Sequence, residues 1–165
     1  MLAFKRLLLV FVLLAAGAAA GVAAHTALTP GDTMFAGKRP ANLGYESGRL
    51  APCKRTPNCV SSQADSKDEE HYIAPIGVKG NAIDQVRKAV ESMPRASVVH
   101  AEPGYLYAEF KSNLMGFVDD VEFLHDPAKG VVHVRSASRL GRRDFGVNRE
   151  RVESLRALIE RRVQG

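Results

Sequence analysis

Between residues 96 and 138, apolar and polar side chains alternate in four stretches that are separated by short turns. Alternation with a period of two is typical of strands that bury one face. The stretches that predict strands are Ala96–Ala101, Tyr105–Lys111, Phe117–His125 and Val131–Ser138. Two of the turns carry proline and glycine, at Glu102–Gly104 and Asp126–Gly130. Because neighbouring strands follow one another closely, they predict an antiparallel meander.

On both sides of this region the apolar positions recur every three or four residues, which predicts helices. The first helix begins after Asn81, a predicted N-cap, and ends at Pro94. The second is predicted from about Arg149 to Val163, with Asn148 as its N-cap. The apolar stripes are Ile83, Val86, Val90 and Met93 in the first helix, and Val152, Leu155, Ile159 and Val163 in the second.

The predicted fold class is α+β, with an antiparallel sheet of four to five strands packed by two helices on one face. The fifth strand is His71–Val78, where Pro75 removes a backbone donor and restricts the segment to an edge. Matching the apolar faces of the last two strands fixes their register. The predicted pairs are Phe123 with Val134, Asp119 with Ser138, and Glu122 with Arg135.

The N-terminus has the layout of a secretory signal. Lys5 and Arg6 precede 18 uncharged residues, Leu7–Ala24, which are rich first in leucine and then in alanine and glycine. The same stretch is close to the shortest length that spans a bilayer, so an uncleaved anchor is the alternative. Cleavage is favoured, because alanine and glycine partition weakly into lipid. Either way, the rest of the chain is predicted to be exported, to the periplasm or to the outer side of the inner membrane.

Four parts are predicted along the chain. Residues 1–24 form the signal peptide or membrane anchor, and residues 25–48 form a tether that proline and glycine interrupt repeatedly. Residues 49–70 form an irregular loop with both cysteines, and residues 71–165 form the compact α+β domain. A domain of this size buries a limited core, so that a nearby covalent link would add useful stability.

Cys53 and Cys59 are the cysteines of this loop, and Pro52 and Pro57 restrict the backbone between them. In an oxidising compartment such a pair predicts a disulfide. A catalytic dithiol would more often show the C-x-x-C spacing, and a zinc site would need two further ligands at regular spacing. The sequence therefore predicts an irregular loop that a Cys53–Cys59 disulfide pins.

The net charge of +5 falls to +3 without residues 1–24, whose charged side chains are Lys5 and Arg6. A surplus of this size does not predict a nucleic-acid partner, and an exported protein rarely meets one. The five histidines show no metal-ligand spacing. No metal and no other cofactor is therefore predicted.

The segment Arg135–Arg149 leaves a strand, passes two glycines and enters a helix, and it carries five arginines. A basic turn at a helix N-terminus is suited to hold an anion. The candidate anion-binding residues are Arg139, Arg142, Arg143 and Arg149. The ligand would be a phospholipid headgroup, a glycan phosphate or an acidic segment of an envelope protein. The other interpretation, which ranks first for the individual residues, is a hydrogen-bonded structural corner made of Arg135, Asp119, Glu122, Asp144 and Asn148.

Asp119 lies among apolar positions of its strand, where a carboxylate needs a hydrogen-bonding partner. Ser138 and Arg139 are the expected partners, and a structural role for Asp119 ranks first. The alternative is a hydrolase or transferase in which Asp119 or Asp120 acts as general base on an arginine-held anionic substrate. No nucleophile or metal constellation accompanies them. A non-catalytic cell-envelope domain that binds an anionic group or a partner therefore ranks above catalysis.

Several stretches together resemble a known family. They are Arg39–Gly44, Leu50–Ser62 with both cysteines, Asp119–Phe123, and Val134–Gly141 continuing to Asp144–Arg149. From Arg39 to the C-terminus the chain is similar to the domain-of-unknown-function family numbered 1499. The resemblance implies no established activity. Members commonly carry N-terminal hydrophobic segments, which agrees with predicted export. Lys54 departs from the family pattern, which often has proline after the first cysteine.

Overall fold

The computed structural model describes residues 35–163. The predicted signal peptide or anchor, residues 1–24, and the first part of the tether lie outside the described residues. In the described part, an antiparallel sheet, two helices and one disulfide form the α+β fold that the sequence predicted. No helix of this part is both long enough and apolar enough to cross a bilayer.

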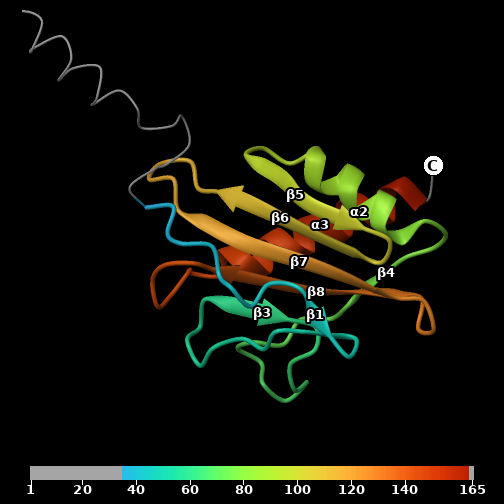
Figure 1. Cartoon of the computed structure of the whole chain (residues 1–165), viewed down its shortest axis with the longest axis horizontal. Helices are drawn as coiled ribbons and strands as arrows, with labels where there is room; N and C mark the ends of the chain where they lie inside the picture. Colours follow the sequence, from blue (N-terminus) through green and yellow to red (C-terminus); the bar gives the residue numbers. More distant parts are fainter. Residues whose placement is uncertain (1–34, 164–165) are drawn as a thin grey trace, which may run out of the picture. The chain divides into compact units, whose positions relative to one another are not determined.

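The predicted meander supplies four adjacent strands of a six-stranded sheet (Figure 1). Its strands are β5 (Ala96–Glu102), β6 (Tyr105–Lys111), β7 (Val118–Asp126) and β8 (Val131–Ser138). Each strand pairs with the next in antiparallel fashion. The predicted register of the last two strands is confirmed. The observed pairs include Phe123 with Val134, Asp119 with Ser138, and Glu122 with Arg135.

Two short strands share the outer edge of β8. One is β4 (Ile76–Gly77), which lies inside the predicted edge strand, and the other is β3 (Cys59–Ser61). The sequence placed Cys59–Ser61 in an irregular loop, so the sheet extends beyond the predicted compact domain. A separate hairpin joins β1 (Tyr45–Glu46) to β2 (Arg49–Leu50).

The two helices cover one face of the sheet (Figure 1). In α2 (Ala82–Glu91), the Asn81 side chain accepts a hydrogen bond from the Asp84 N–H, which confirms the predicted cap. The helix α3 begins at Val147 and ends at Val163, so Asn148 lies inside its first turn and the predicted N-cap is wrong.

The Asp144 carboxylate accepts hydrogen bonds from the N–H groups of Gly146 and Asn148 at this helix start, at 3.1 and 2.9 Å. An aspartate side chain in this place satisfies donors that have no partner within the helix. It also places a negative charge at the positive end of the helix dipole. The sequence predicted that the start of α3 could hold an external anion. In the structure, the Asp144 carboxylate already occupies this place.

Strand alternation gives the sheet two different faces. The face beneath the helices is the apolar core, in which Leu106, Val121, Phe123, Val132 and Val134 are fully buried. The opposite face carries tyrosines, carboxylates and arginines, and residues 35–50 cross over it. We call residues 35–50 the covering segment. Its Leu43 and Leu50 pack against Tyr105, Tyr107 and Leu124 of the sheet.

Candidate functional site

The charged face of the sheet contains a buried ion pair between Glu122 of β7 and Arg135 of β8. Arg135 Nη1 donates to Glu122 Oε2 at 2.9 Å, and the Glu122 side chain is 0 % exposed. The other Glu122 oxygen accepts hydrogen bonds from the Tyr105 hydroxyl at 2.9 Å and from the Gly44 N–H at 2.7 Å. The carboxylate is therefore satisfied by two strands and by the covering segment.

A second ion pair on this face joins Arg139 to two carboxylates. Its Nε donates to both oxygens of Asp120, at 3.1 and 3.0 Å, and its Nη2 donates to Glu109 Oε1. Arg39 of the covering segment donates to the same Glu109 oxygen at 2.6 Å. Burial raises the pKa of Glu109, but the hydrogen bonds from Arg39 and Arg139 outweigh it, so that its pKa is lowered.

Tyr107 lies between these carboxylates. Its hydroxyl is 2.6 Å from Asp120 Oδ1 and 2.8 Å from Glu109 Oε1. Burial raises the pKa of Tyr107, and the hydrogen bond to Asp120 raises it further, so the hydroxyl remains a donor. Arg39 stacks on the ring, with its guanidinium carbon 5.6 Å from the ring centroid. The network therefore holds charged side chains in fixed positions.

Beside this network lies a small cavity of about 140 Å³. Lys38, Pro40 and Asn42 of the covering segment line one side, and Lys54, Asn58 and Cys59 of the disulfide loop line another. The sheet contributes Asp120 of β7, together with Arg135, Ala137, Ser138 and the following Arg139 at the end of β8. Each of the stretches on which the family resemblance rests thus contributes to one cavity, which we call the arginine cavity.

Arg135 lines this cavity and has a donor that no described residue accepts. Its side chain is 5 % exposed, and its Nε–H has no hydrogen-bond acceptor among the described residues. A buried donor without a partner is costly, and each such group in a folded protein requires an explanation. Lys38 and Lys54, which also line the cavity, are exposed and form no ion pair within residues 35–163.

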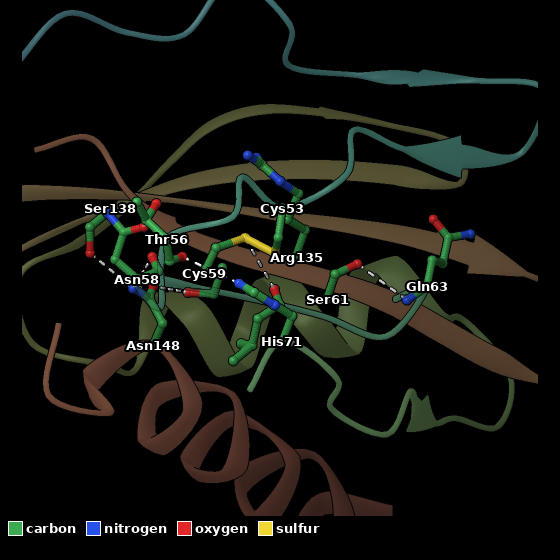
Figure 2. Close-up of a disulfide and its surroundings, with 12 residues drawn as sticks. Cys53, Thr56, Asn58, Cys59, Ser61, Gln63, His71, Arg135, Ser138 and Asn148 are labelled. Atoms are coloured by element: carbon green, nitrogen blue, oxygen red, sulfur yellow. Dashed lines mark hydrogen bonds between the residues drawn. A yellow bond between two sulfur atoms is a disulfide. The ribbon is translucent and has the colours of Figure 1, made fainter. Parts of the chain in front are cut away.

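The disulfide between Cys53 and Cys59 is confirmed, with the Cα atoms 5.7 Å apart. Figure 2 shows it beside β8, with Asn58, Ser138 and Asn148 meeting near one end. Asn58 donates to the carbonyl oxygen of Gly141 at 2.8 Å and accepts at its own carbonyl from the Ser138 N–H. The loop that the disulfide closes is thereby attached to the end of β8 and forms a wall of the arginine cavity.

Asp119 lies on the helix side of the sheet, opposite Asp120. Its partner is Arg151 of α3, with Nη2 2.5 Å from Oδ2. The sequence predicted Ser138 and Arg139 as partners. The prediction is wrong because Arg139 follows Ser138 by one residue and so turns to the other face, where it binds Asp120. Both aspartates are therefore held by arginines, on different faces.

The predicted structural corner is consequently two networks. Arg135 and Glu122 belong to the charged face, whereas Asp119, Asp144 and Asn148 belong to the side of α3. The fully buried Asn148 connects α3 to the rest of the corner. Its amide donates to the Asn58 carbonyl, the Ser138 hydroxyl and Asp144, and its oxygen accepts from Ser136 and Arg151.

The four arginines predicted to bind an anion are not at one site. Arg139 is bound to Asp120 and Glu109 at the arginine cavity. Arg149 donates to the carbonyl oxygens of Glu69 and Tyr72, at 3.0 and 2.8 Å. It thereby fixes the loop that contains these two residues to α3. Arg142 and Arg143 are exposed and have no hydrogen-bonding or ionic partner in the described part of the chain.

Several residues of the cavity and its network were not singled out from the sequence, among them Lys38, Lys54, Tyr107 and Glu109. A signal for two of them was present. Tyr105, Tyr107 and Glu109 occupy alternate positions of one strand, and Glu109 is paired with Asp120 in the neighbouring strand. No group of three or more histidine, cysteine, aspartate or glutamate side chains in residues 35–163 is arranged to hold a metal ion.

His71 attaches the next segment of the chain to the disulfide loop. Its Nδ1 lies 2.8 Å from Asp68 Oδ2, and its Nε2 lies 3.3 Å from the Thr56 carbonyl oxygen. Because both neighbours are acceptors, the doubly protonated imidazolium satisfies both. Burial lowers the pKa of His71, but the hydrogen bonds to Asp68 and Thr56 outweigh it and leave the pKa raised.

A raised pKa in the folded state predicts a pH-dependent stability. The contribution of His71 is complete below its ordinary pKa of 6.5 and is lost as the pH rises through the folded-state value. We expect wild type to gain free energy of unfolding between about pH 8 and about pH 6, relative to His71→Gln. Urea denaturation at both pH values measures this, with His125→Gln as control. Equal pH dependence of wild type and His71→Gln would contradict it.

A family model described as "Protein of unknown function (DUF1499)" matches residues 49–159. No curated protein and no solved structure matches the chain. The matched residues include the disulfide loop, the six-stranded sheet and most of α3. They therefore include the sheet and loop walls of the arginine cavity, whereas Lys38, Pro40 and Asn42, which complete it, precede the match. The chain belongs to the DUF1499 family of proteins of unknown function.

Proposed function

We propose that this protein is a non-catalytic domain of the cell envelope that binds a small oxyanion in the arginine cavity. The observation that carries the proposal is the buried Arg135, which lines a cavity together with Lys38 and Lys54 and whose side chain has a donor that Glu122 does not use. A guanidinium presents parallel N–H donors that match the oxygens of a carboxylate or a phosphate. The Arg135 guanidinium, its burial and the two neighbouring lysines all favour an anion.

The charges around the cavity favour a ligand with one or two negative charges. Arg39, Arg135 and Arg139 are matched by three carboxylates, those of Glu109, Asp120 and Glu122. Lys38 and Lys54 are left without carboxylate partners in the described structure. A ligand that compensates these two lysines would restore neutrality without breaking either buried ion pair. It would also place an oxyanion beside the Arg135 side chain, which lines the cavity.

The cavity volume limits the size of the bound group. A water molecule takes up roughly 30 Å³ in the liquid, so about 140 Å³ has room for a phosphate or carboxylate group with little else. A larger ligand, such as a phospholipid or a phosphorylated glycan, would place only its anionic group in the cavity. The proposed chemistry is therefore that of an oxyanion, whether free or at the end of a larger molecule.

We expect phosphate to stabilise the protein against thermal and urea denaturation. An anion present at 100 times its dissociation constant adds about 2.7 kcal/mol to the free energy of unfolding. The Lys38→Ala/Lys54→Ala double variant should bind roughly tenfold more weakly, because the two unbalanced charges at the cavity are gone. Arrays of phosphate, sulfate, acetate, glycerol phosphate and chloride, at matched ionic strength, distinguish a specific oxyanion from general screening of charge.

The control is Lys79→Ala, which removes an exposed lysine that lines none of the described cavities and changes the net charge in the same direction. Arg135→Lys is informative as well, because it keeps the charge beside Glu122 but removes the planar group of donors. Its free energy of unfolding reports on the ion pair and its phosphate response reports on the site. Equal stabilisation of wild type and both cavity variants, or none by any oxyanion, would contradict the proposal.

The alternative function is a hydrolase or transferase with Asp119 or Asp120 as general base. A general base must reach the proton of a bound substrate or water. Asp119 is buried and held by Arg151 beneath the sheet, and Asp120 is buried and held by Arg139 on the other side. No observation favours catalysis by either residue, and we do not propose it.

A further inference from the structure

The exposed apolar side chains of the described part are concentrated in two loops. The described part has seven exposed large apolar residues, and five of them lie in the stretches 112–117 and 139–147. The side chains of Leu114 and Phe145 are 93 % and 91 % exposed. The other three are Met115, Leu140 and Val147. Single exposed apolar residues are ordinary, but their concentration in one place indicates an interaction surface.

These two loops lie at the same end of the sheet, where the described chain also begins (Figure 1). The Arg139 N–H donates to the Val118 carbonyl oxygen at 3.2 Å, which joins the ends of β8 and β7. The ring of Phe35 lies 5.2 Å from that of Phe117, between centroids. We call residues 35–38, 111–117 and 139–147 the loop end.

The backbone holds Phe145 in its outward position. Its φ of 55° lies in the left-handed region, which a bulky side chain rarely adopts. The Asp144 carboxylate, bound to the N–H groups of Gly146 and Asn148, fixes the turn on both sides. A strained residue that its surroundings hold in place is characteristic of positions with a function. The loop end thus holds an exposed aromatic ring in a fixed position before any partner binds.

The loop end is also positively charged. Its exposed cations are Lys38, Lys111, Arg142 and Arg143. The one acidic residue in its three stretches is Asp144, whose carboxylate is bound to the start of α3. Exposed apolar and aromatic side chains surrounded by lysine and arginine are the composition of a surface that lies at a lipid headgroup layer. Anionic lipids attract such a surface, and each basic residue near the bilayer strengthens the attraction.

The part of the chain that precedes the loop end points to the same occupant. Leu7–Ala24 contains no charge and is predicted to be a signal or an anchor. Residues 25–34 connect it to Phe35, and ten residues reach at most about 35 Å. An anchor in Leu7–Ala24 would therefore keep the loop end close to the bilayer.

We propose that the loop end lies on an anionic phospholipid bilayer. Phe145 and Leu114 insert at the level of the headgroups, and Arg142 and Arg143 contact lipid phosphates. The interaction goes beyond oxyanion binding in the arginine cavity. The side chains that insert or contact lipid phosphates do not line that cavity, so either proposal can fail alone.

The test uses the absence of tryptophan from the chain. The full-length Phe145→Trp variant is reconstituted into vesicles of phosphatidylglycerol and phosphatidylcholine, and tryptophan fluorescence is recorded with brominated lipids or acrylamide as quenchers. We expect a blue-shifted emission, strong quenching by brominated lipid and weak quenching by acrylamide. Adding Arg142→Ala/Arg143→Ala, or using phosphatidylcholine alone, should reduce the quenching by brominated lipid severalfold.

The matched control is Tyr45→Trp, which replaces a 48 % exposed aromatic residue that packs against Tyr105 at the start of β6, away from the loop end. In the same vesicles its emission should remain accessible to acrylamide. Equal accessibility of the two variants to acrylamide would overturn the proposal. So would a Phe145→Trp signal that is shielded from acrylamide but not quenched by brominated lipid, which would assign the loop end to a protein partner or a second copy.

Discussion

Glu122→Ala is expected to lower the free energy of unfolding by about 3–5 kcal/mol, which is the usual cost of removing one partner from a buried ion pair. The substitution leaves Arg135 charged and buried, and it also removes the acceptor of the Tyr105 hydroxyl and the Gly44 N–H. Natural domains have total stabilities of about 5–15 kcal/mol. The variant should therefore be largely unfolded in mild urea, as followed by far-ultraviolet circular dichroism.

A double substitution distinguishes the cost of an unpaired buried charge from the loss of the proposed oxyanion site. Replacing both partners by apolar residues of similar volume, in Glu122→Leu/Arg135→Met, removes the unpaired charge and often restores much of the stability. We expect this variant to unfold at higher urea than Glu122→Ala and to show no response to phosphate. A loss of less than about 1 kcal/mol in Glu122→Ala would mean that solvent reaches Arg135 and that the pair is not buried in solution.

Asn148→Ala is expected to cost about 2–4 kcal/mol, because each polar group that it leaves buried and unpaired costs about 1–3 kcal/mol. The amide of Asn148 donates hydrogen bonds to the Asn58 carbonyl, the Ser138 hydroxyl and Asp144. Its loss therefore detaches α3 from both the disulfide loop and the end of β8. Hydrogen exchange should show the largest loss of protection at the start of α3 and in β3.

The control for this substitution is Asn113→Ala, because Asn113 is an exposed loop residue. Surface substitutions of this kind change the free energy of unfolding by less than about 0.5 kcal/mol. A cost for Asn148→Ala that equals the cost for Asn113→Ala would show that the buried amide contributes nothing to the corner. The two variants thus measure the same chemical change in two environments.

The local pattern of the sequence was sufficient for the meander, both helices and the register of β7 and β8. Alternation of apolar residues specifies which face each side chain occupies, and a slip of one residue would have exposed Phe123 and Val134. The disulfide was predictable for a related reason, since a close pair of cysteines in a chain that is predicted to be exported leaves few other possibilities. These features depend on residues that are close in the sequence, or on the pairing of one strand or one cysteine with another.

The strand β3 and the partner of Asp119 were not predictable in this way. Three residues are too few to show a period, and Cys59–Ser61 becomes a strand only because the distant edge of β8 accepts it. Arg151 reaches Asp119 because α3 lies across the sheet at a particular angle, which no strand register specifies. The separate positions of the four arginines predicted to bind one anion have a third reason. The helix terminus was satisfied internally by Asp144, and the side chains separated to three different surroundings.

The covering segment has a consequence for the order in which the chain folds. In the covering segment, Gly44 binds Glu122 and Arg39 binds Glu109; in the disulfide loop, Asn58 binds Gly141. The partners of these early residues are therefore synthesised much later. Contacts between such distant positions slow folding, because a long loop must close before they form. A chain that emerges from its N-terminus cannot complete its charged face until β8 has appeared. We therefore expect the domain to stay incompletely folded for most of its synthesis.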